Sequence, residues 1–282
     1  MKTVLLPDGA RVPALGQGTW RMGEDKTKHK DEVAALLLGI ELGLTLIDTA
    51  EMYGEGGAEE VVADAIAGQR ERVFIVTKVY PHNASRTRLP KACEHSLRRL
   101  RTDTIDLYLL HWRGDVPLSE TVEAFEKVRS AGKIRRWGVS NFDVEDMEEL
   151  FAIENGANCV TNQVLYNLRH REIEFDLLSG SEHSTENRQL PIMAYSPIGH
   201  GRGLLNNDKL KQIAKLHEVT PAQIALAWVL RESQMIAIPK SSNQTHVRDN
   251  ARAADVKLTK QDLADLDKEF PPAKSKKPLP TL

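Results

Sequence analysis

The chain has 282 residues, with 38 basic against 40 acidic side chains and a formal net charge of −2. Such a balance gives nucleic acids or anionic membranes no strongly attractive surface, so neither is expected as a partner. There is no apolar stretch long enough to span a bilayer, and the first apolar run is too short for a signal peptide. We therefore expect a soluble, cytoplasmic protein.

Cysteine and histidine usage points the same way. Cys93 and Cys159 lie in apolar contexts and are expected to be buried thiols in a reducing compartment. The nine histidines are scattered without a His-x-x-x-His pair, and there is no Cys-x-x-Cys. We expect no metal site.

A short hairpin opens the chain, with expected strands at 4–6 and 11–13 and Asp8-Gly9 in the turn. Eight apolar runs follow, each with a polar residue or glycine at or near its carboxyl end. The expected strands are 14–20, 46–50, 74–79, 105–111, 136–140, 159–165, 192–196 and 236–240.

Helical spacing of apolar residues fills the intervals between these strands. The first helix carries Val33, Leu36, Leu37 and Ile40 and ends at Gly43. Further helices are expected at 58–67, 89–100, 119–128, 144–151, 208–217, 221–231, from 245, and 260–269.

Two helix caps and two irregular stretches complete this description. Ser119 and Thr220 are expected N-caps, with Pro221 as the first residue of its helix. The polar segment 179–189 is expected to be a helix end or loop. The glycine-rich loop 199–203 is expected to be mobile.

Residues 271–282 form a Pro- and Lys-rich tail, which is expected to be irregular. Its Lys274, Lys276 and Lys277 are expected to be solvated, with a flap over a cofactor as the alternative.

The strand ends recur about every 30 residues, and eight such units are what a closed (β/α)8 barrel needs. A single TIM barrel domain covering 1–282, with an N-terminal hairpin and extra C-terminal helices, therefore fits the chain. Doubly wound sheets alternate in the same way and stay open as an alternative. However, Gly16-x-Gly18-x-x-Arg21 lacks the third small residue of a dinucleotide fingerprint, so a Rossmann site is rejected here.

Four polar residues stand at or just beyond the carboxyl ends of successive strands: Asp48, Tyr53, Lys78 and His111. In a parallel barrel these ends form the face on which active sites are built. A buried lysine needs a carboxylate, and Asp48 is the nearest candidate. A neighbouring cation favours phenolate, so we expect Lys78 to make Tyr53 more acidic and a proton donor to a developing alkoxide.

Each of these residues also has a plainer interpretation. Tyr53 could be a packing residue, Asp48 and Lys78 a structural ion pair, and His111 a histidine bonded to backbone. Their occurrence together, at equivalent depths of successive units, favours a catalytic site.

The chain resembles the aldo-keto reductases from the hairpin to the last helix. The motifs that carry the resemblance are Asp48-Thr49-Ala50-x-x-Tyr53, Thr77-Lys78, Leu110-His111, Gly138-Val139-Ser140-Asn141-Phe142, Asn162-Gln163, Tyr195-Ser196-Pro197 and Ile238-Pro239-Lys240-Ser241. Within the family, the chain is similar to the bacterial reductases of small ketoaldehydes such as methylglyoxal. The motifs that carry this closer likeness are Gln17-Gly18-Thr19-Trp20, Leu44-Thr45-Leu46-Ile47-Asp48-Thr49-Ala50-Glu51 and Leu226-Ala227-Trp228.

The resemblance implies an NADPH-dependent reduction of small aldehydes and ketoaldehydes to alcohols. Tyr53 would be the general acid, tuned by Asp48 and Lys78, and His111 would orient the carbonyl. Tyr195 would stack on the nicotinamide, a flat apolar face that leaves the other side for hydride transfer. Ser140, Asn141 and Gln163 would hold its carboxamide, Lys240 and Ser241 the 2′-phosphate, and Asn250 the adenine.

Two sets of contacts follow from the resemblance. The expected cofactor-binding residues are Gly18, Thr19, Trp20, Asp48, Ser140, Asn141, Gln163, Tyr195, Ser196, Pro197, Ile198, Gly199, Lys240, Ser241, His246 and Asn250. The expected substrate-binding residues are Trp20, Tyr53, Tyr80, His82, His111 and Trp112.

The sequence departs from the family pattern at three places. His246 stands where many relatives carry a phosphate-binding arginine, so NADPH should be preferred over NADH by a reduced margin. Gly54-Glu55-Gly56-Gly57 replaces a compact Asn-Glu pair after Tyr53. The loop after His111 and the tail are short, so the pocket should be open and shallow. We expect a monomer.

Two other functions use the same residues. The chain could keep NADPH as a redox sensor or regulatory subunit with little turnover. A Schiff-base lyase with Lys78 as nucleophile is a further alternative, but Asp48 would keep that amine charged.

Overall fold

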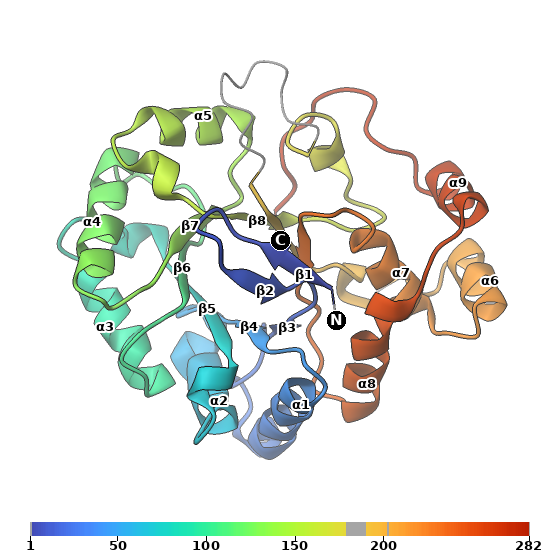
Figure 1. The fold of residues 1–282 in the computed structure, drawn as a ribbon, viewed down its shortest axis with the longest axis horizontal. Helices are drawn as coiled ribbons and strands as arrows, with labels where there is room; N and C mark the ends of the chain where they lie inside the picture. The colour runs from blue at the N-terminus through green and yellow to red at the C-terminus, as the bar shows by residue number, and fades with distance from the viewer. Residues whose placement is uncertain (1, 179–189, 202, 282) are drawn as a thin grey trace.

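The structure, a computed structural model, describes residues 2–178, 190–201 and 203–281. In these residues an eight-stranded parallel sheet curls round a central axis, and helices surround it (Figure 1). The strands are β3 (Gln17–Gly18), β4 (Leu46–Asp48), β5 (Phe74–Val79), β6 (Leu107–Leu110), β7 (Trp137–Ser140), β8 (Asn162–Leu165), β9 (Ile192–Tyr195) and β10 (Met235–Ala237). Several are shorter than expected, most of all the first.

The two ends of this sheet, β3 and β10, meet and close the barrel. Parallel bridges join Leu15 to Ala237 and Gly18 to Lys240. A Cβ on Gly18 would lie 2.8 Å from the Ile238 carbonyl oxygen, so only glycine lets the chains come this close. The (β/α)8 barrel is thereby confirmed over the doubly wound alternative.

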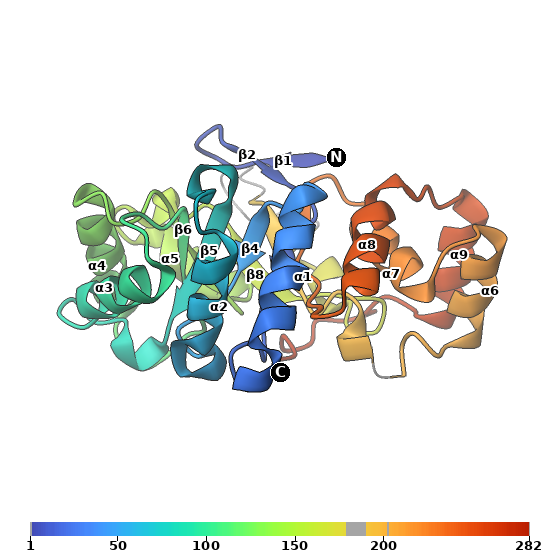
Figure 2. The same cartoon turned by 90° about the horizontal axis from the view of Figure 1, so that it is seen from below.

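The N-terminal hairpin is also confirmed. β1 (Thr3–Leu5) pairs antiparallel with β2 (Arg11–Pro13), and Gly9 takes a positive φ of 87° in the turn. Figure 2 shows the hairpin across one end of the barrel and the C-terminus at the opposite end. The tail residues 271–281 contain neither helix nor strand, and Lys276 forms ion pairs with Glu145 and Asp176 rather than being simply solvated.

Nine α-helices lie within the described residues: α1 (His29–Glu41), α2 (Gly57–Ala65), α3 (Leu89–Leu100), α4 (Leu118–Ser130), α5 (Val144–Ala152), α6 (Asp208–Leu216), α7 (Pro221–Val229), α8 (Gln244–Arg252) and α9 (Lys260–Glu269). Thr220 caps α7 with Pro221 as its first residue, as expected. Ser119 as an N-cap was wrong. The N-cap is Pro117, two residues earlier, and its carbonyl accepts from the N–H groups of Glu120 and Thr121.

Other expectations have mixed outcomes. Both cysteines are buried as expected, and burial raises the pKa of the Cys93 thiol to about 12. The segment 179–189 lies outside the described residues. Residues Gly199–Gly201 form a 3-10 turn, and the mobility of this loop stays a prediction.

Strand pleating decides which residues enter the barrel. Val76 and Lys78 share one face of β5, and Thr77 lies on the other. Val76 belongs to a core cluster with Leu46 and Leu107 from the neighbouring strands, while the outward Ile75 packs with residues of α2 and α3. The two-residue period of the strand therefore points the Lys78 side chain into the barrel, one layer beyond the apolar side chains of Val76, Leu46 and Leu107.

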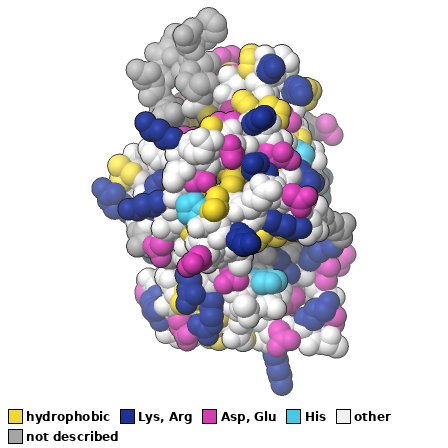
Figure 3. All heavy atoms as spheres, turned by 90° about the vertical axis from the view of Figure 1, so that its right-hand side faces the viewer, with side chains coloured by type: hydrophobic (Ala, Val, Ile, Leu, Met, Phe, Trp, Pro, Cys, Tyr) yellow, Lys and Arg dark blue, Asp and Glu magenta, His cyan; other side chains and the backbone are white. Residues whose placement is uncertain are grey.

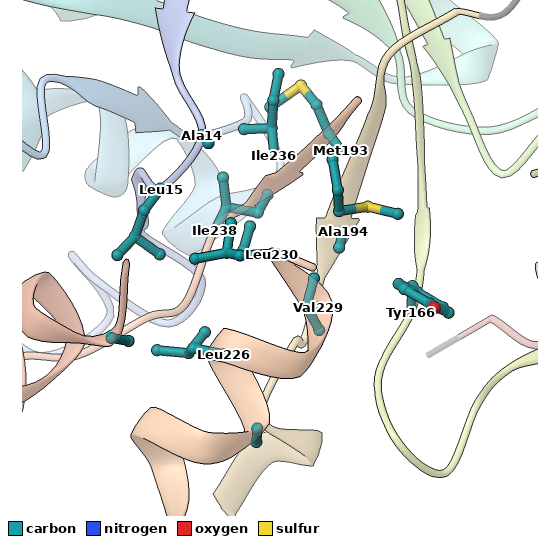
Figure 4. Packing of buried hydrophobic residues seen from close by; sticks show 14 of the residues in the cluster. Ala14, Leu15, Tyr166, Met193, Ala194, Leu226, Val229, Leu230, Ile236 and Ile238 are labelled. Atoms are coloured by element: carbon teal, nitrogen blue, oxygen red, sulfur yellow. The ribbon is translucent and has the colours of Figure 1, made fainter. Parts of the chain in front are cut away.

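The C-terminal half packs α7 against β9 and β10. Figure 4 shows Val229 of α7 beside Ala194 of β9, and Leu230, the residue after α7, beside Ile238, which follows β10. α7 is apolar nearly all round because it is covered on every side, with all its residues from Gln223 to Val229 buried.

The outer surface shows no strong bias toward one charge on the side formed by α6 and α9. Figure 3 shows basic and acidic side chains interspersed there, with small apolar patches between them. Among the described residues, no helix combines the length and apolar character needed to cross a membrane.

The outer face of β5 is held by a buried carboxylate. Glu59 of α2 accepts from the Thr77 hydroxyl and from Arg99 Nε of α3, both at 2.6 Å, and its side chain is fully buried. The register of the strand next to Lys78 thus depends on a polar contact with the helix layer.

Replacing Glu59 tests this contact. Glu59→Ala leaves Arg99 without its partner, and breaking a buried ion pair typically costs about 3 kcal/mol, so the free energy of unfolding should fall by about that amount. Urea unfolding followed by circular dichroism measures it. The exposed neighbour Glu60→Ala is the control and should stay within about 0.5 kcal/mol of the unsubstituted protein. Equal values for the two variants would contradict the role of Glu59.

Candidate active site

Lys78 is the centre of the site. Its ammonium is fully buried and donates to Asp48 Oδ1 at 2.7 Å, to the Thr49 carbonyl at 2.9 Å and to the Tyr53 oxygen at 3.2 Å. These three bonds use all three protons that an ammonium can donate. The expected Asp48–Lys78 pair and its approach to Tyr53 are therefore present in the structure.

The ion pair keeps Lys78 charged despite its burial. Burial by itself would lower the pKa of Lys78, but the charges and hydrogen bonds of Asp48 and Tyr53 raise it above its ordinary value. Burial raises the pKa of Asp48, while Lys78 and a hydrogen bond from Gln163 oppose this. The Gln163 amide donates to Asp48 Oδ2 at 2.7 Å, so both carboxylate oxygens have a donor.

Tyr53 is less acidic than expected. Burial is the largest influence and raises the pKa of its hydroxyl, and it outweighs the opposing effect of the Lys78 cation. The expectation of a net acidified phenol was wrong because the same burial that makes the lysine effective also disfavours a phenolate. At neutral pH the hydroxyl therefore keeps its proton.

His111 lies against Tyr53 and is neutral. The two rings meet edge to face with centroids 5.7 Å apart. Burial and the nearby charge of Lys78 lower the pKa of His111 to about 2. Its Nδ1 is buried and has no hydrogen-bond partner among the described residues. A buried, unpaired ring nitrogen beside a protonated phenol is unusual outside functional sites.

The polar residues at the ends of β7, β8 and β9 form a connected group. The Ser140 hydroxyl donates to the Gln163 carbonyl at 2.8 Å, and the Asn141 amide donates to the Ser140 hydroxyl and to the His111 carbonyl at 3.2 Å. The Tyr195 hydroxyl donates to Asn141 Oδ1 at 3.0 Å. The structure thus brings these residues to the same end of the barrel as His111.

The loops after β3 and β9 approach each other. The buried Thr19 hydroxyl donates to the Asp48 carbonyl at 3.0 Å. Trp20 lies on the surface with its ring 4.8 Å from that of His200, and Ser196 Oγ bonds His200 Nε2 at 2.6 Å. The remaining residues expected here are the buried Gly18 and Pro197 and the half-buried Ile198 and Gly199.

The residues expected around the cofactor phosphate lie after β10 and on α8. Lys240 Nζ donates to Ser242 Oγ at 2.8 Å. Burial lowers the pKa of Lys240, with a contribution from the cations Lys28 and Arg21, while Glu32 and Glu24 act in the opposite direction. Ser241 and Asn250 line a hollow of about 10 Å³. His246 is exposed in the first turn of α8.

The remaining expected substrate contacts form an aromatic wall, defined here as Tyr80, His82 and Trp112. The Tyr80 ring stacks on His82 at 4.8 Å and meets Trp112 edge to face at 5.9 Å. Trp112 in turn lies 4.9 Å from His111. A larger cavity, about 250 Å³ beside Lys2 and Leu230, contains none of the expected site residues.

Sequence reasoning missed two contacts. The Thr49 carbonyl that accepts from Lys78 is a backbone group, which leaves no trace in side-chain identity. Glu51 accepts from the Tyr80 N–H and from the Asn83 amide, and so connects the aromatic wall to the loop that carries Tyr53. Glu51 ends the motif Leu44–Glu51 that carries the closer likeness, but nothing in that motif indicates a contact with Tyr80 or Asn83.

The comparisons with known proteins agree with this geometry. The model of the aldo/keto reductase family matches residues 14–269. Methylglyoxal reductase YeaE of Escherichia coli is 52% identical over 98% of this chain and 97% of its own length, and a glyoxal reductase of Bacillus subtilis is 34% identical over 94% and 91%. An aldo-keto reductase of Klebsiella pneumoniae, solved in complex with NADPH, superposes with a TM-score of 0.95 at 50% identity, covering 100% of this chain and 99% of that one.

The chain therefore belongs to the aldo/keto reductase family and is an oxidoreductase. The resemblance inferred from the motifs is confirmed.

The protonation state of His111 gives a direct test. With a folded pKa near 2 against about 6.5 unfolded, the unfolded chain binds the extra proton over that interval, so stability falls as the pH drops below about 6.5. Relative to His111→Asn, the free energy of unfolding should fall more steeply, by about 1.4 kcal/mol per pH unit. The ¹⁵N shifts of the His111 ring should stay those of neutral imidazole down to about pH 5. A midpoint near 6.5 would contradict this.

Proposed function

We propose that the chain reduces small aldehydes and ketoaldehydes with NADPH and that Tyr53 donates the proton. The observation that carries this is the direction of the hydrogen bond between Lys78 and Tyr53. Because Lys78 is the donor, the phenol oxygen is the acceptor and the phenol proton stays free for a substrate oxygen.

The neighbouring residues support proton transfer from this phenol. Tyr53 keeps its proton until a stronger base, the oxygen of a reduced carbonyl, forms beside it. The charged Lys78 then stabilises the phenolate that is left. His111 is neutral and so carries a single ring N–H. This N–H and the Tyr53 hydroxyl would together hold the carbonyl oxygen of the substrate as negative charge develops on it.

The residues present also fit the cofactor. Lys240 is a half-buried cation whose pKa is influenced by Lys28 and Arg21 and also by Glu32 and Glu24, and its ammonium can pair with a phosphate group. The polar group of Ser140, Asn141 and Gln163 offers donors and acceptors for a carboxamide beside His111. When bound, NADPH supplies the hydride.

The names of the relatives support the substrate class. A methylglyoxal reductase and a glyoxal reductase are among the proteins most similar to this chain over their full lengths. The Schiff-base alternative is disfavoured by the raised pKa of Lys78, because a nucleophilic amine must be uncharged. A redox sensor is distinguished by turnover: a catalyst oxidises many equivalents of NADPH, whereas a sensor oxidises only the one that it binds.

Tyr53→Phe tests the proton donor. The substitution removes the hydroxyl and keeps the ring, so kcat with methylglyoxal should fall by at least about 10²-fold, as is usual for the loss of a general acid. NADPH binding, followed by the fluorescence of the reduced cofactor, should stay unchanged. Tyr80→Phe removes a different phenol from the same end of the barrel and should keep near-normal turnover. Near-normal turnover by Tyr53→Phe would overturn the assignment.

His246→Arg tests the cofactor preference. An arginine can bond a 2′-phosphate through two parallel N–H groups, so the ratio of kcat/KM for NADPH over NADH should rise by about tenfold. Initial rates with each cofactor at fixed methylglyoxal give this ratio. Thr245→Arg adds the same charge at the neighbouring exposed position and should change the ratio little. Equal ratios for both variants would remove His246 from the phosphate site.

A further inference from the structure

Glu51 has no part in the mechanism proposed above, yet its carboxylate accepts hydrogen bonds from the loop that carries part of the aromatic wall. Its Oε1 accepts from the Tyr80 N–H at 2.7 Å and from the Asn83 amide at 3.1 Å. Its own N–H donates to the Lys78 carbonyl at 3.3 Å. One residue thus joins the loop after β5 to the loop that leads to Tyr53.

The loop held by Glu51 carries two of the three members of the aromatic wall. Tyr80 is extended, and the short 3-10 turn η4 (Pro81–Asn83) follows it. Glu51 bonds both ends of this four-residue stretch, at Tyr80 and at Asn83. On the other side Arg88 donates to the His82 carbonyl at 3.0 Å. A carboxylate forms stronger hydrogen bonds than a neutral acceptor, so Glu51 restricts where the wall stands.

The wall continues without a break into the catalytic residues. Tyr80 meets Trp112, Trp112 meets His111, and His111 meets Tyr53, with ring centroids 5.9, 4.9 and 5.7 Å apart. A small carbonyl compound would contact only Tyr53 and His111, at the inner end of this row of rings. A substrate with an aromatic ring extends outward and needs Tyr80 and His82 in place.

We propose that Glu51 is a positioning residue that sets how well the enzyme binds larger aldehydes, by holding the aromatic wall against the catalytic residues. This inference rests on the proposed function, because it takes Tyr53 and His111 as the place where the carbonyl reacts. It concerns substrate binding and leaves the proton transfer untouched.

Glu51→Ala is the main test. With 4-nitrobenzaldehyde its KM should rise by about fivefold while kcat stays within about twofold, which is the pattern of lost uniform binding. With methylglyoxal both constants should stay within about twofold. Glu51→Gln should restore most of the effect, because an amide oxygen accepts from the same two donors. Asn83→Ala keeps the carboxylate but removes one donor, and should raise KM in the same direction by less.

A double-mutant cycle separates positioning from a general structural effect. If Glu51 acts through the wall, Glu51→Ala should change nothing further in a Tyr80→Ala background. Glu55→Gln is the control for charge, since it removes one negative charge from the same loop and its carboxylate bonds none of the described residues. The proposal would be overturned if the KM effects of Glu51→Ala and Tyr80→Ala were additive, or if Glu51→Ala lowered kcat with both substrates. It would also be overturned if Glu55→Gln raised KM as much as Glu51→Ala.

The two proposals fail in different ways. If the unsubstituted protein reduces neither aldehyde, the proposed function fails. The dissociation constant of 4-nitrobenzaldehyde, from quenching of the Trp112 fluorescence, still tests the wall, with Trp112→Phe to identify the signal. A constant unchanged by Glu51→Ala would overturn the positioning role in either case.

Discussion

The ion pair between Lys78 and Asp48 is the interaction on which the site depends. A buried ammonium is costly unless it is paired and its remaining donors are satisfied. Here the pair is 2.7 Å long, the Thr49 carbonyl and the Tyr53 oxygen take the other two protons, and Gln163 completes the carboxylate. Asp48, Thr49 and Tyr53 come from β4 and the loop after it, Lys78 from β5 and Gln163 from β8, so the pair can exist only when these three strands are in register around a closed barrel.

This arrangement also decides the state of the neighbouring titratable groups. Lys78 stays charged, and its charge together with burial keeps His111 neutral, while burial keeps Tyr53 protonated. A neutral imidazole and a neutral phenol side by side can donate to one oxygen without repelling each other. In the proposed mechanism the Lys78 cation therefore acts mainly after the proton has left the phenol, when it faces the new negative charge.

The fold was predictable because its determinants are local and repeated. Apolar runs with period two, helical stripes between them and a repeat of about 30 residues define a barrel before any contact is known. The four polar strand ends could be placed at one mouth for the same reason. Thr220 and Pro221 also marked their helix start correctly, because a cap acts within a single turn.

What could not be predicted depends on distances between separate segments. The side-chain amide of Gln163 donates to Asp48, 115 positions earlier in the chain, and no local pattern in the sequence indicates that contact. The pKa of Tyr53 depends on whether burial or the cation is stronger, a comparison that needs coordinates. Ser119 failed as a cap because the Pro117 carbonyl already starts α4. Each of these features depends on contacts between groups whose distances the sequence does not give.

The end of β5 divides the residues proposed to take part in the reaction from those proposed to select the substrate. Its inner face presents Lys78 to Asp48, and its outer face presents Thr77 to Glu59, so polar contacts on both sides of one strand hold Lys78 in place. Beyond the strand end, the chain is held by Glu51 rather than by sheet hydrogen bonds. Because a loop can change its contacts without disturbing the ladder behind it, the residues of the aromatic wall can vary while Lys78 and its partners stay in place. The boundary between the two lies between Val79, the last residue of β5, and Tyr80.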